Sequence, residues 1–288
     1  MVKFLITGAN GQLAKEFIKF FEQNNKNFVA LSKQQLDITD FNKVLECIKE
    51  IKPDIIINCA AYNLVDNAEI DDTPALKVNF EGVKNLAIVC RDKNIFLVHF
   101  STDYVFDGEK EGLYVEEDVP NPINKYGKSK LLGENFLKEN LERFLVFRIS
   151  WVYGEGGQNF LYKLIQWAKT QQYLKIACDE FSVPTSTKTV VEVTIKAVEK
   201  NLCGLYHLVN SGYTSRYELA KKFFEIKEIN KFIYPVYQKD FNLPAKRPKF
   251  SAMDNTKLKN ILNIEIPFWE EELRRIFSEN KQVDTLKL

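Results

Sequence analysis

The fold is decided at the start of the chain, where residues 2–14 read VKFLITGANGQLA. The apolar run over residues 2–7 predicts a buried strand, and residues 12–24 predict a helix whose large apolar side chains share one face. Gly8 and Gly11 lie between them and let the chain turn sharply from strand to helix. A strand, a glycine turn and a helix predict the first unit of a parallel sheet.

The same alternation continues as far as residue 150. Strands alternating with helices of ten or more residues predict an α/β fold, a doubly wound parallel sheet of the Rossmann type with helices on both faces. We expect further strands at residues 28–31, 54–58, 96–101 and 144–149, and further helices at residues 41–51, 75–91 and 128–140. Residues 1–150 are therefore expected to form a dinucleotide-binding domain.

After residue 150 the pattern loosens. We expect residues 151–288 to form mainly a smaller α/β lobe that binds the substrate, while a helix at about residues 186–201 returns to the larger domain. Helices are also predicted at residues 160–170 and 269–278, a short strand at residues 206–209, and a surface excursion rich in proline at residues 235–248.

Composition narrows the class of protein. Forty Lys and Arg nearly cancel 39 Asp and Glu, which argues against nucleic acid or an anionic membrane as a partner. No apolar run is long enough to span a bilayer, and the segment before Gly8 is too short for a secretion signal. Five scattered cysteines without CxxC spacing indicate reduced thiols rather than disulfides or a zinc site. We therefore expect a cytoplasmic protein.

The glycine turn points to a nucleotide. The spacing is GxxGxxA, with Ala14 in the third small position. A pyrophosphate must approach backbone amides at a helix N-terminus, and a side chain on the turn would hold it away. Ala60 and Ala61, which follow the third predicted strand, leave room for the nicotinamide ribose, and Asp37 and Ile38 are placed to flank the adenine.

The end of the second predicted strand bears on the choice of cofactor. Dinucleotide-binding domains that use NADH commonly carry a carboxylate here, which bonds the ribose hydroxyls. This chain has Ser32 and Lys33 instead, so nothing repels a 2′-phosphate and Lys33 can neutralise one. The sequence therefore predicts NADPH or NADH, with a modest preference for NADPH.

A second motif points to proton transfer. Tyr126 and Lys130 form a YxxxK pair, which places both side chains on one face of a helix. An ammonium near a tyrosine favours the phenolate and so lowers the pKa of the hydroxyl. Thr102 follows the fourth predicted strand, at the sheet edge where ligands bind, and could hold a substrate carbonyl.

Together these segments resemble a known family. The runs TGxxGQL (7–13), STDYVFDG (101–108), YGKSKLxGE (126–134) and RxSWxYG (148–154) are similar to those of the dTDP-4-dehydrorhamnose reductase family, within the extended short-chain dehydrogenase/reductase superfamily. The likeness covers essentially the whole chain. It implies NAD(P)H-dependent reduction of the 4-keto group of dTDP-4-dehydro-L-rhamnose to give dTDP-L-rhamnose, a precursor of cell-surface polysaccharide.

The resemblance also implies residue roles. It implies cofactor contacts from Gly11, Gln12, Leu13, Asp37, Ile38, Ala61, Tyr62, Asn63 and Lys130. The residue patterns described above add Gly8, Ser32, Lys33, Ala60 and Tyr126 to the predicted cofactor site. Thr102, Tyr126 and Lys130 would be catalytic, with Tyr126 as the acid. The nucleotide-sugar substrate would contact Val65, Thr102, Asp103, Tyr104 and Trp151.

The sequence departs from the family at three places and leaves alternatives open. Ala14 replaces the usual third glycine, Cys59 stands where alanine is common, and Ser32-Lys33 supplies no ribose acid. Some family members hold magnesium through glutamates at a dimer contact. Those glutamates cannot be matched here, so no metal ligands are assigned and a homodimer stays open.

Three other functions compete with this reading. A reductase of another nucleotide-linked 4-keto-6-deoxysugar could share every motif. A 4,6-dehydratase or epimerase is disfavoured because Asp103-Tyr104 replaces the usual Asp-Glu of dehydratases. A non-catalytic subunit resembling the regulatory subunit of methionine adenosyltransferase is disfavoured by the intact Tyr126 and Lys130. His99 and His207 lie in apolar strand patterns, which favours a structural role in the core.

Overall fold

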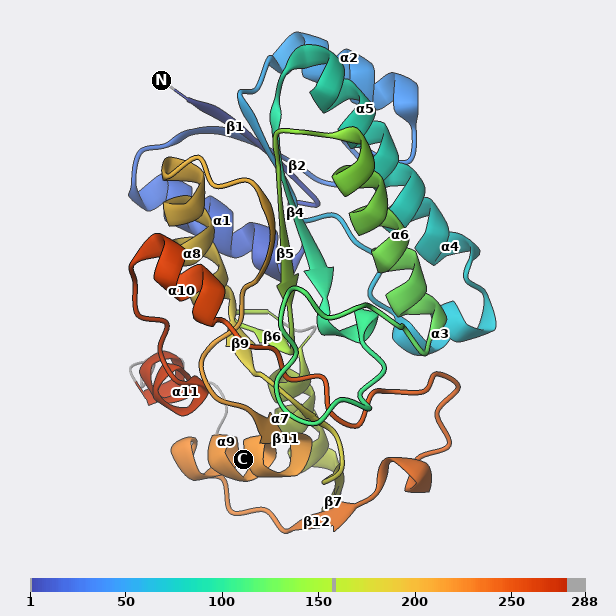
Figure 1. Cartoon of the computed structure of the whole chain (residues 1–288). Coiled ribbons are helices and arrows are strands. Elements are labelled where there is room, and N and C mark those ends of the chain that lie inside the picture. Colours follow the sequence, from blue (N-terminus) through green and yellow to red (C-terminus); the bar gives the residue numbers. More distant parts are fainter. Residues whose placement is uncertain (1, 157–158, 279–288) are drawn as a thin grey trace.

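The computed structural model describes residues 2–156 and 159–278, and its centre is a parallel sheet of six strands (Figure 1). The strands lie in the order β10-β5-β4-β3-β1-β2. Their bounds are β1 (Lys3–Thr7), β2 (Asn27–Leu31), β3 (Ile55–Asn58), β4 (Phe96–Thr102), β5 (Phe144–Ile149) and β10 (Gly204–His207). β2 and β3 flank β1 on opposite sides, so the strand order reverses there and leaves a crevice beyond the carboxyl ends of β1 and β3.

Helices cover both faces of this sheet, as predicted (Figure 1). On one face, α1 (Gln12–Gln23) packs against α8 (Thr187–Glu199), with α10 (Thr256–Leu262) beside them. The opposite face carries α2 (Phe41–Ile51), α5 (Gly82–Lys93) and α6 (Lys125–Asn140). Each face has its own apolar core, which explains why the inner strands are apolar at consecutive positions.

A smaller lobe lies at the carboxyl ends of β4 and β5 (Figure 1). It contains α7 (Phe160–Thr170), α9 (Arg216–Ile226), α11 (Trp269–Ser278) and a parallel pair, β7 (Leu174–Ala177) with β12 (Ile233–Val236). Short elements connect these parts: α3 (Val65–Ile70), β6 (Val152–Tyr153), β8 (Phe181–Ser182), β9 (Thr185–Ser186), β11 (Thr214–Ser215), and 3₁₀ turns at Asp103–Val105 and Gln238–Asp240. The sequence analysis did not predict α9, α10, β7 or β12.

Two elements differ from expectation. The helix predicted at residues 75–91 consists of α4 (Thr73–Leu76), a π-helical turn (Lys77–Glu81) and α5. The expected helix, α8, is not the only late element that returns to the large sheet. β10 pairs with β5, and α10 packs against β10. One strand of the large sheet, β10, therefore comes after the domain boundary expected at residue 150. The division into two domains stays a prediction.

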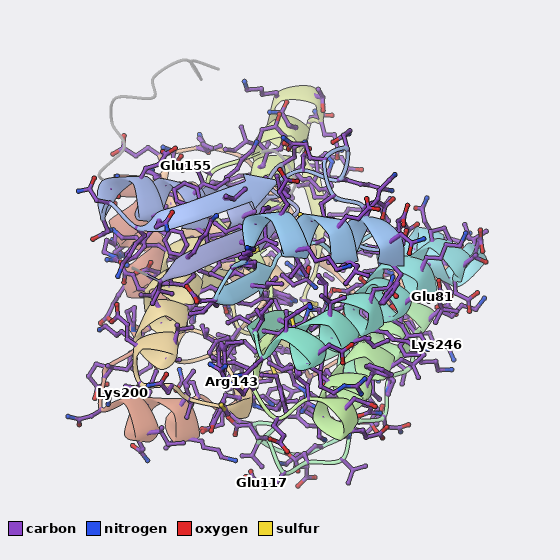
Figure 2. The ribbon with its side chains drawn as sticks, turned by 90° about the horizontal axis from the view of Figure 1, so that it is seen from above. Glu81, Glu117, Arg143, Glu155, Lys200 and Lys246 are labelled. Carbon is purple, nitrogen blue, oxygen red and sulfur yellow. The ribbon has the colours of Figure 1, made fainter. Side chains whose placement is uncertain are left out.

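Many charged side chains lie on the surface. Glu81, Glu117 and Lys200 are exposed and lie at the outer edge of the molecule when it is viewed from above (Figure 2). Within residues 2–156 and 159–278, no helix has the length and apolar character needed to cross a membrane. All five cysteines are free thiols.

Candidate active site

A cleft of about 1970 Å³ lies between the carboxyl ends of the central strands and the lobe. It brings together every residue for which the sequence predicted a role, except Ser32. The predicted residues that line it are Gly8, Gly11, Gln12, Leu13, Lys33, Asp37, Ile38, Ala60, Ala61, Tyr62, Asn63, Val65, Thr102, Asp103, Tyr104, Tyr126, Lys130 and Trp151. Ser32 instead donates its hydroxyl proton to the Gln35 side-chain oxygen at 3.0 Å.

The glycine turn has the geometry that a close ligand needs. Gly8 has a φ of +66°, and a Cβ at this position would lie 2.9 Å from the Ala60 backbone. Gly11 caps α1 without any side-chain hydrogen bond, so the positive end of a 12-residue helix faces the cleft. These features fit a pyrophosphate held by backbone amides.

Gln12 ties this turn to the lobe. Its side-chain amide donates to the Val152 carbonyl at 3.3 Å, and its oxygen accepts from Asn159 at 2.6 Å. Asn159 also caps α7 by accepting from the Tyr162 amide. The N-termini of two helices are therefore held together at one wall of the cleft.

The π-helical turn positions the segment after β3. Asn79 lies within this turn and is fully buried. Its side chain accepts from the Tyr62 amide at 2.9 Å and donates to the Tyr62 carbonyl at 3.0 Å and to Ser129 at 3.0 Å. Asn79 thus fixes the backbone beside the expected nicotinamide position, a role that the sequence analysis did not assign.

The proposed catalytic side chains converge where β4 ends. Tyr126 is 9% exposed and its hydroxyl donates to Asn63 at 3.4 Å. Thr102 accepts from the Tyr104 amide at 3.2 Å and donates to Asp103 at 3.2 Å. Lys130, only 2% exposed, donates from Nζ to the Phe100 carbonyl at 2.6 Å.

Burial dominates the electrostatics of this group. Burial raises the pKa of Tyr126, and the neighbouring Thr102 side chain acts in the opposite direction. Burial lowers the pKa of Lys130 to about 8, opposed by the charge of Glu134. In this structure Lys130 is directed at the Phe100 carbonyl and burial has the largest effect on the pKa of Tyr126, so the lowering of that pKa by Lys130 stays a prediction.

The sequence pattern of the family described as "RmlD substrate binding domain" matches residues 2–282. The chain belongs to this family, the dTDP-4-dehydrorhamnose reductases. The dTDP-4-dehydrorhamnose reductase of Aggregatibacter actinomycetemcomitans is 35% identical over 96% of this chain and 98% of its own. The crystal structure of dTDP-4-dehydrorhamnose reductase from Bacillus anthracis in complex with NADP is 36% identical, with a TM-score of 0.93 over 97% of this chain and all of its own. The dTDP-4-keto-6-deoxy-D-glucose reductase of Streptomyces niveus is 35% identical over 78% of each chain.

Within this reductase family member, Asp103 lies in the protein interior. The side chain is 2% exposed, and its Oδ2 accepts from Ser182 at 2.8 Å and from Ser251 at 2.6 Å. Burial raises the pKa of Asp103 to about 6, although hydrogen bonds from Ser251, Ser182 and Thr102 lower it. Asp103 orients the Thr102 hydroxyl and joins the end of β4 to the lobe, while its expected contact with the sugar stays a prediction.

An aromatic and charged group forms the lobe side of the cleft. Trp151 has a φ of +40°, a strained conformation for a non-glycine residue, and strain of this kind is concentrated at functional sites. The Arg216 guanidinium lies 3.6 Å from the centre of the Trp151 ring and 3.5 Å from Glu180. Tyr104 donates to the same Glu180 at 3.3 Å. Arg216 and Glu180 were missed from the sequence because no local pattern links them to residue 151.

Two further residues affect what the cleft can bind. Lys33 is exposed at the rim of the cleft, where a screened contact with a 2′-phosphate is predicted. Val65 is the first residue of α3 and lines the part of the cleft where the sugar is expected. In the part of the chain that the structure describes, no group of three or more His, Cys, Asp or Glu side chains could hold a metal ion. Magnesium therefore stays unassigned.

Proposed function

We propose that this protein is a cytoplasmic, NAD(P)H-dependent reductase that converts the 4-keto group of dTDP-4-dehydro-L-rhamnose to the alcohol of dTDP-L-rhamnose. The observation that carries the proposal is the convergence of Thr102, Tyr126 and Lys130 in the same cleft as the Gly8–Gly11 turn. A buried tyrosine hydroxyl beside a nucleotide-binding turn suits protonation of a carbonyl oxygen during hydride transfer.

The residues of the cleft fit a nicotinamide dinucleotide. Gly8 and Gly11 leave the N-terminus of α1 open to a pyrophosphate. Gly8 also lets the turn pack against Ala60, because a side chain at Gly8 would collide with that residue. Ala60, Ala61 and Lys130 would hold the nicotinamide end, and Lys33 would lie near a 2′-phosphate. When bound, the reduced cofactor supplies a hydride to the substrate carbonyl carbon. The NADP complex of the Bacillus anthracis relative supports a modest preference for NADPH.

The side chains around Tyr126 supply and control the proton. Because burial disfavours its phenolate, Tyr126 is protonated at neutral pH and holds a proton that it can donate to the carbonyl oxygen. Thr102 lines the same cleft and lowers the pKa of Tyr126 against the effect of burial, which favours the phenolate that forms after donation. Lys130, buried behind Tyr126 on the same helix, is positioned to contact the cofactor.

A direct assay tests the proposal. Purified protein, NADPH and enzymatically prepared dTDP-4-dehydro-L-rhamnose should show substrate-dependent loss of the absorbance of reduced nicotinamide. Tyr126→Phe should lower kcat by on the order of 10²-fold, the usual scale for a positioned general acid, with little change in cofactor affinity. Tyr173→Phe, at an exposed tyrosine outside the cleft, is the matched control. If Tyr126→Phe keeps the kcat of the control while chemistry is rate-limiting, Tyr126 is not the acid.

A second candidate is a reductase for a different nucleotide-linked 4-keto-6-deoxysugar. It is favoured by the similarity to the Streptomyces niveus enzyme named for dTDP-4-keto-6-deoxy-D-glucose. Identification of the product by NMR after turnover with each sugar separates the two candidates and gives the configuration at C4. Light scattering of the purified protein tests whether two copies form a homodimer.

A further inference from the structure

A continuous line of buried polar groups runs beneath the floor of the cleft. It starts at Thr7 on β1, passes through Asn58 on β3 and His99 on β4, and reaches Lys130 on α6. The Thr7 hydroxyl donates to Asn58 Oδ1 at 2.6 Å, Asn58 Nδ2 lies 3.1 Å from His99 Nδ1, and His99 Nε2 lies 3.4 Å from Lys130 Nζ. All four side chains are at most 2% exposed, so water does not compete for these contacts.

The sheet register places these groups side by side. Thr7 and Asn58 are direct partners across β1 and β3, and Asn58 and His99 are direct partners across β3 and β4. The line therefore follows the sheet at right angles to the strands and links the nucleotide-binding turn to the helix that carries Tyr126.

The donors along this line decide where His99 carries its proton. Asn58 Oδ1 accepts from two donors, the Thr7 hydroxyl and the Ala60 amide at 3.2 Å, so the NH₂ group of Asn58 faces His99. His99 Nδ1 must then be the acceptor, and a neutral ring carries its proton on Nε2. The ring is neutral because burial, and secondarily the charge of Lys130, hold the pKa of His99 well below its usual range.

This tautomer aims a donor at Lys130. An ammonium has three donors and no acceptor, so the Nε2–H of His99 would oppose it, whereas a neutral amine has a lone pair that accepts. Lys130 already donates one N–H to the Phe100 carbonyl at 2.6 Å, so either another N–H or the lone pair of Nζ faces the imidazole. The other charged group that acts on Lys130 is Glu134 on α6, whose carboxylate is neutralised by a bidentate contact with Arg148 on β5.

We propose that His99 is a positioning residue for the reductase reaction: Asn58 holds it in the Nε2-protonated tautomer, from which it donates to the amine form of Lys130 and controls when Lys130 takes up a proton. The inference rests on the proposed function for the role of Lys130, but the tautomer itself does not. This assigns a task to a histidine whose place in an apolar strand predicts only a structural role.

The tautomer can be read directly in the unmodified protein. The chain has two histidines, so ¹⁵N-histidine labelling gives two imidazole patterns, and His207→Gln assigns the remaining one to His99. We expect the His99 ring to stay neutral with its proton on Nε2 from about pH 5 to 9, and its Nε2 resonance to shift as Lys130 titrates near pH 8. A proton on Nδ1, or a ring that becomes charged in this range, overturns the proposal.

A kinetic test uses His99→Gln, whose amide oxygen can accept from an ammonium and cannot enforce the imidazole tautomer. Exchanging one buried hydrogen bond to the amine for one to the ammonium should raise the pKa of Lys130 by on the order of one pH unit. Because the cofactor contact proposed for Lys130 is made by its ammonium, the alkaline limb of the kcat/KM profile should move upward by the same amount. His207→Gln, at the other buried histidine, should leave the limb in place. A limb that does not move in a folded His99→Gln enzyme overturns the proposal, whereas the predicted tautomer in a protein without reductase activity refutes the proposed function alone.

Discussion

A methyl group added at Gly127 should push the catalytic helix α6 away from the 3₁₀ turn at Asp103–Val105, which follows β4. Gly127 follows Tyr126 on α6, and a Cβ there would lie 2.1 Å from the Tyr104 carbonyl oxygen and 3.0 Å from the Pro122 side chain. Real Cβ atoms essentially never come closer than 3.0 Å to such an atom, so Gly127→Ala must push the start of α6 away by about 1 Å. A shift of that size in a catalytic group lowers kcat by on the order of 10²-fold.

The cost in stability should be smaller than the cost in activity. Overpacking of a close contact destabilises by about 1–3 kcal/mol, and alanine returns about 1 kcal/mol through its higher helix propensity. Steady-state kinetics and urea unfolding of Gly127→Ala measure both effects. Lys128→Ala, at the exposed neighbour on the same helix, is the control and should match wild type in kcat. A Gly127→Ala enzyme with the kcat and stability of that control would show that the close approach of α6 to the 3₁₀ turn at Tyr104 does not matter.

The remaining predictions concern charge. Lys33→Glu should reverse a roughly five-fold preference for NADPH over NADH, mainly through KM and more clearly at low salt, because the lysine is exposed and its contact is screened. Equal effects on both cofactors would mean that Lys33 points to solvent. Because folding raises the pKa of Asp103 to about 6, the wild type should lose stability at this site as pH rises from about 4 through 6, by at most about 3 kcal/mol. Asp103→Asn has no such group, so its free energy of unfolding relative to wild type should increase over that range, and a pH-independent difference would contradict the assignment.

The sequence predicted best what depends on neighbouring residues. The periodicity of the apolar residues placed the sheet strands from β1 to β5, and the strand and helix on either side of Gly8 and Gly11 identified the nucleotide turn. Tyr126 and Lys130 were found together because residues four positions apart on a helix share a face. In each case the deciding partner is within one turn or one βα unit of the chain.

What the sequence could not predict depends on partners far along the chain. Arg216 stacks on Trp151 from a helix that begins 65 residues later, and no sequence pattern near either residue predicts this contact. The role of Asn79 was missed for the same reason, because its side chain bonds the backbone of Tyr62, a residue outside its own helix. His99 was correctly expected to be buried, but only the register of β3 and β4 brings it against Asn58, and only the packing of α6 on β4 brings it against Lys130.

The return of β10 and α8 to the large sheet dictates when this protein can fold during synthesis. The apolar faces of α1 and β1 are covered by α8, so the first residues made on the ribosome must wait for residues 187–199 before their core closes. A nascent chain that has emerged only to β5 leaves the apolar face of α1 without α8 and the edge of β5 without β10. We therefore expect the nucleotide site to become competent only after α8 and β10 have been translated, and a fragment ending near residue 150 to aggregate rather than bind cofactor.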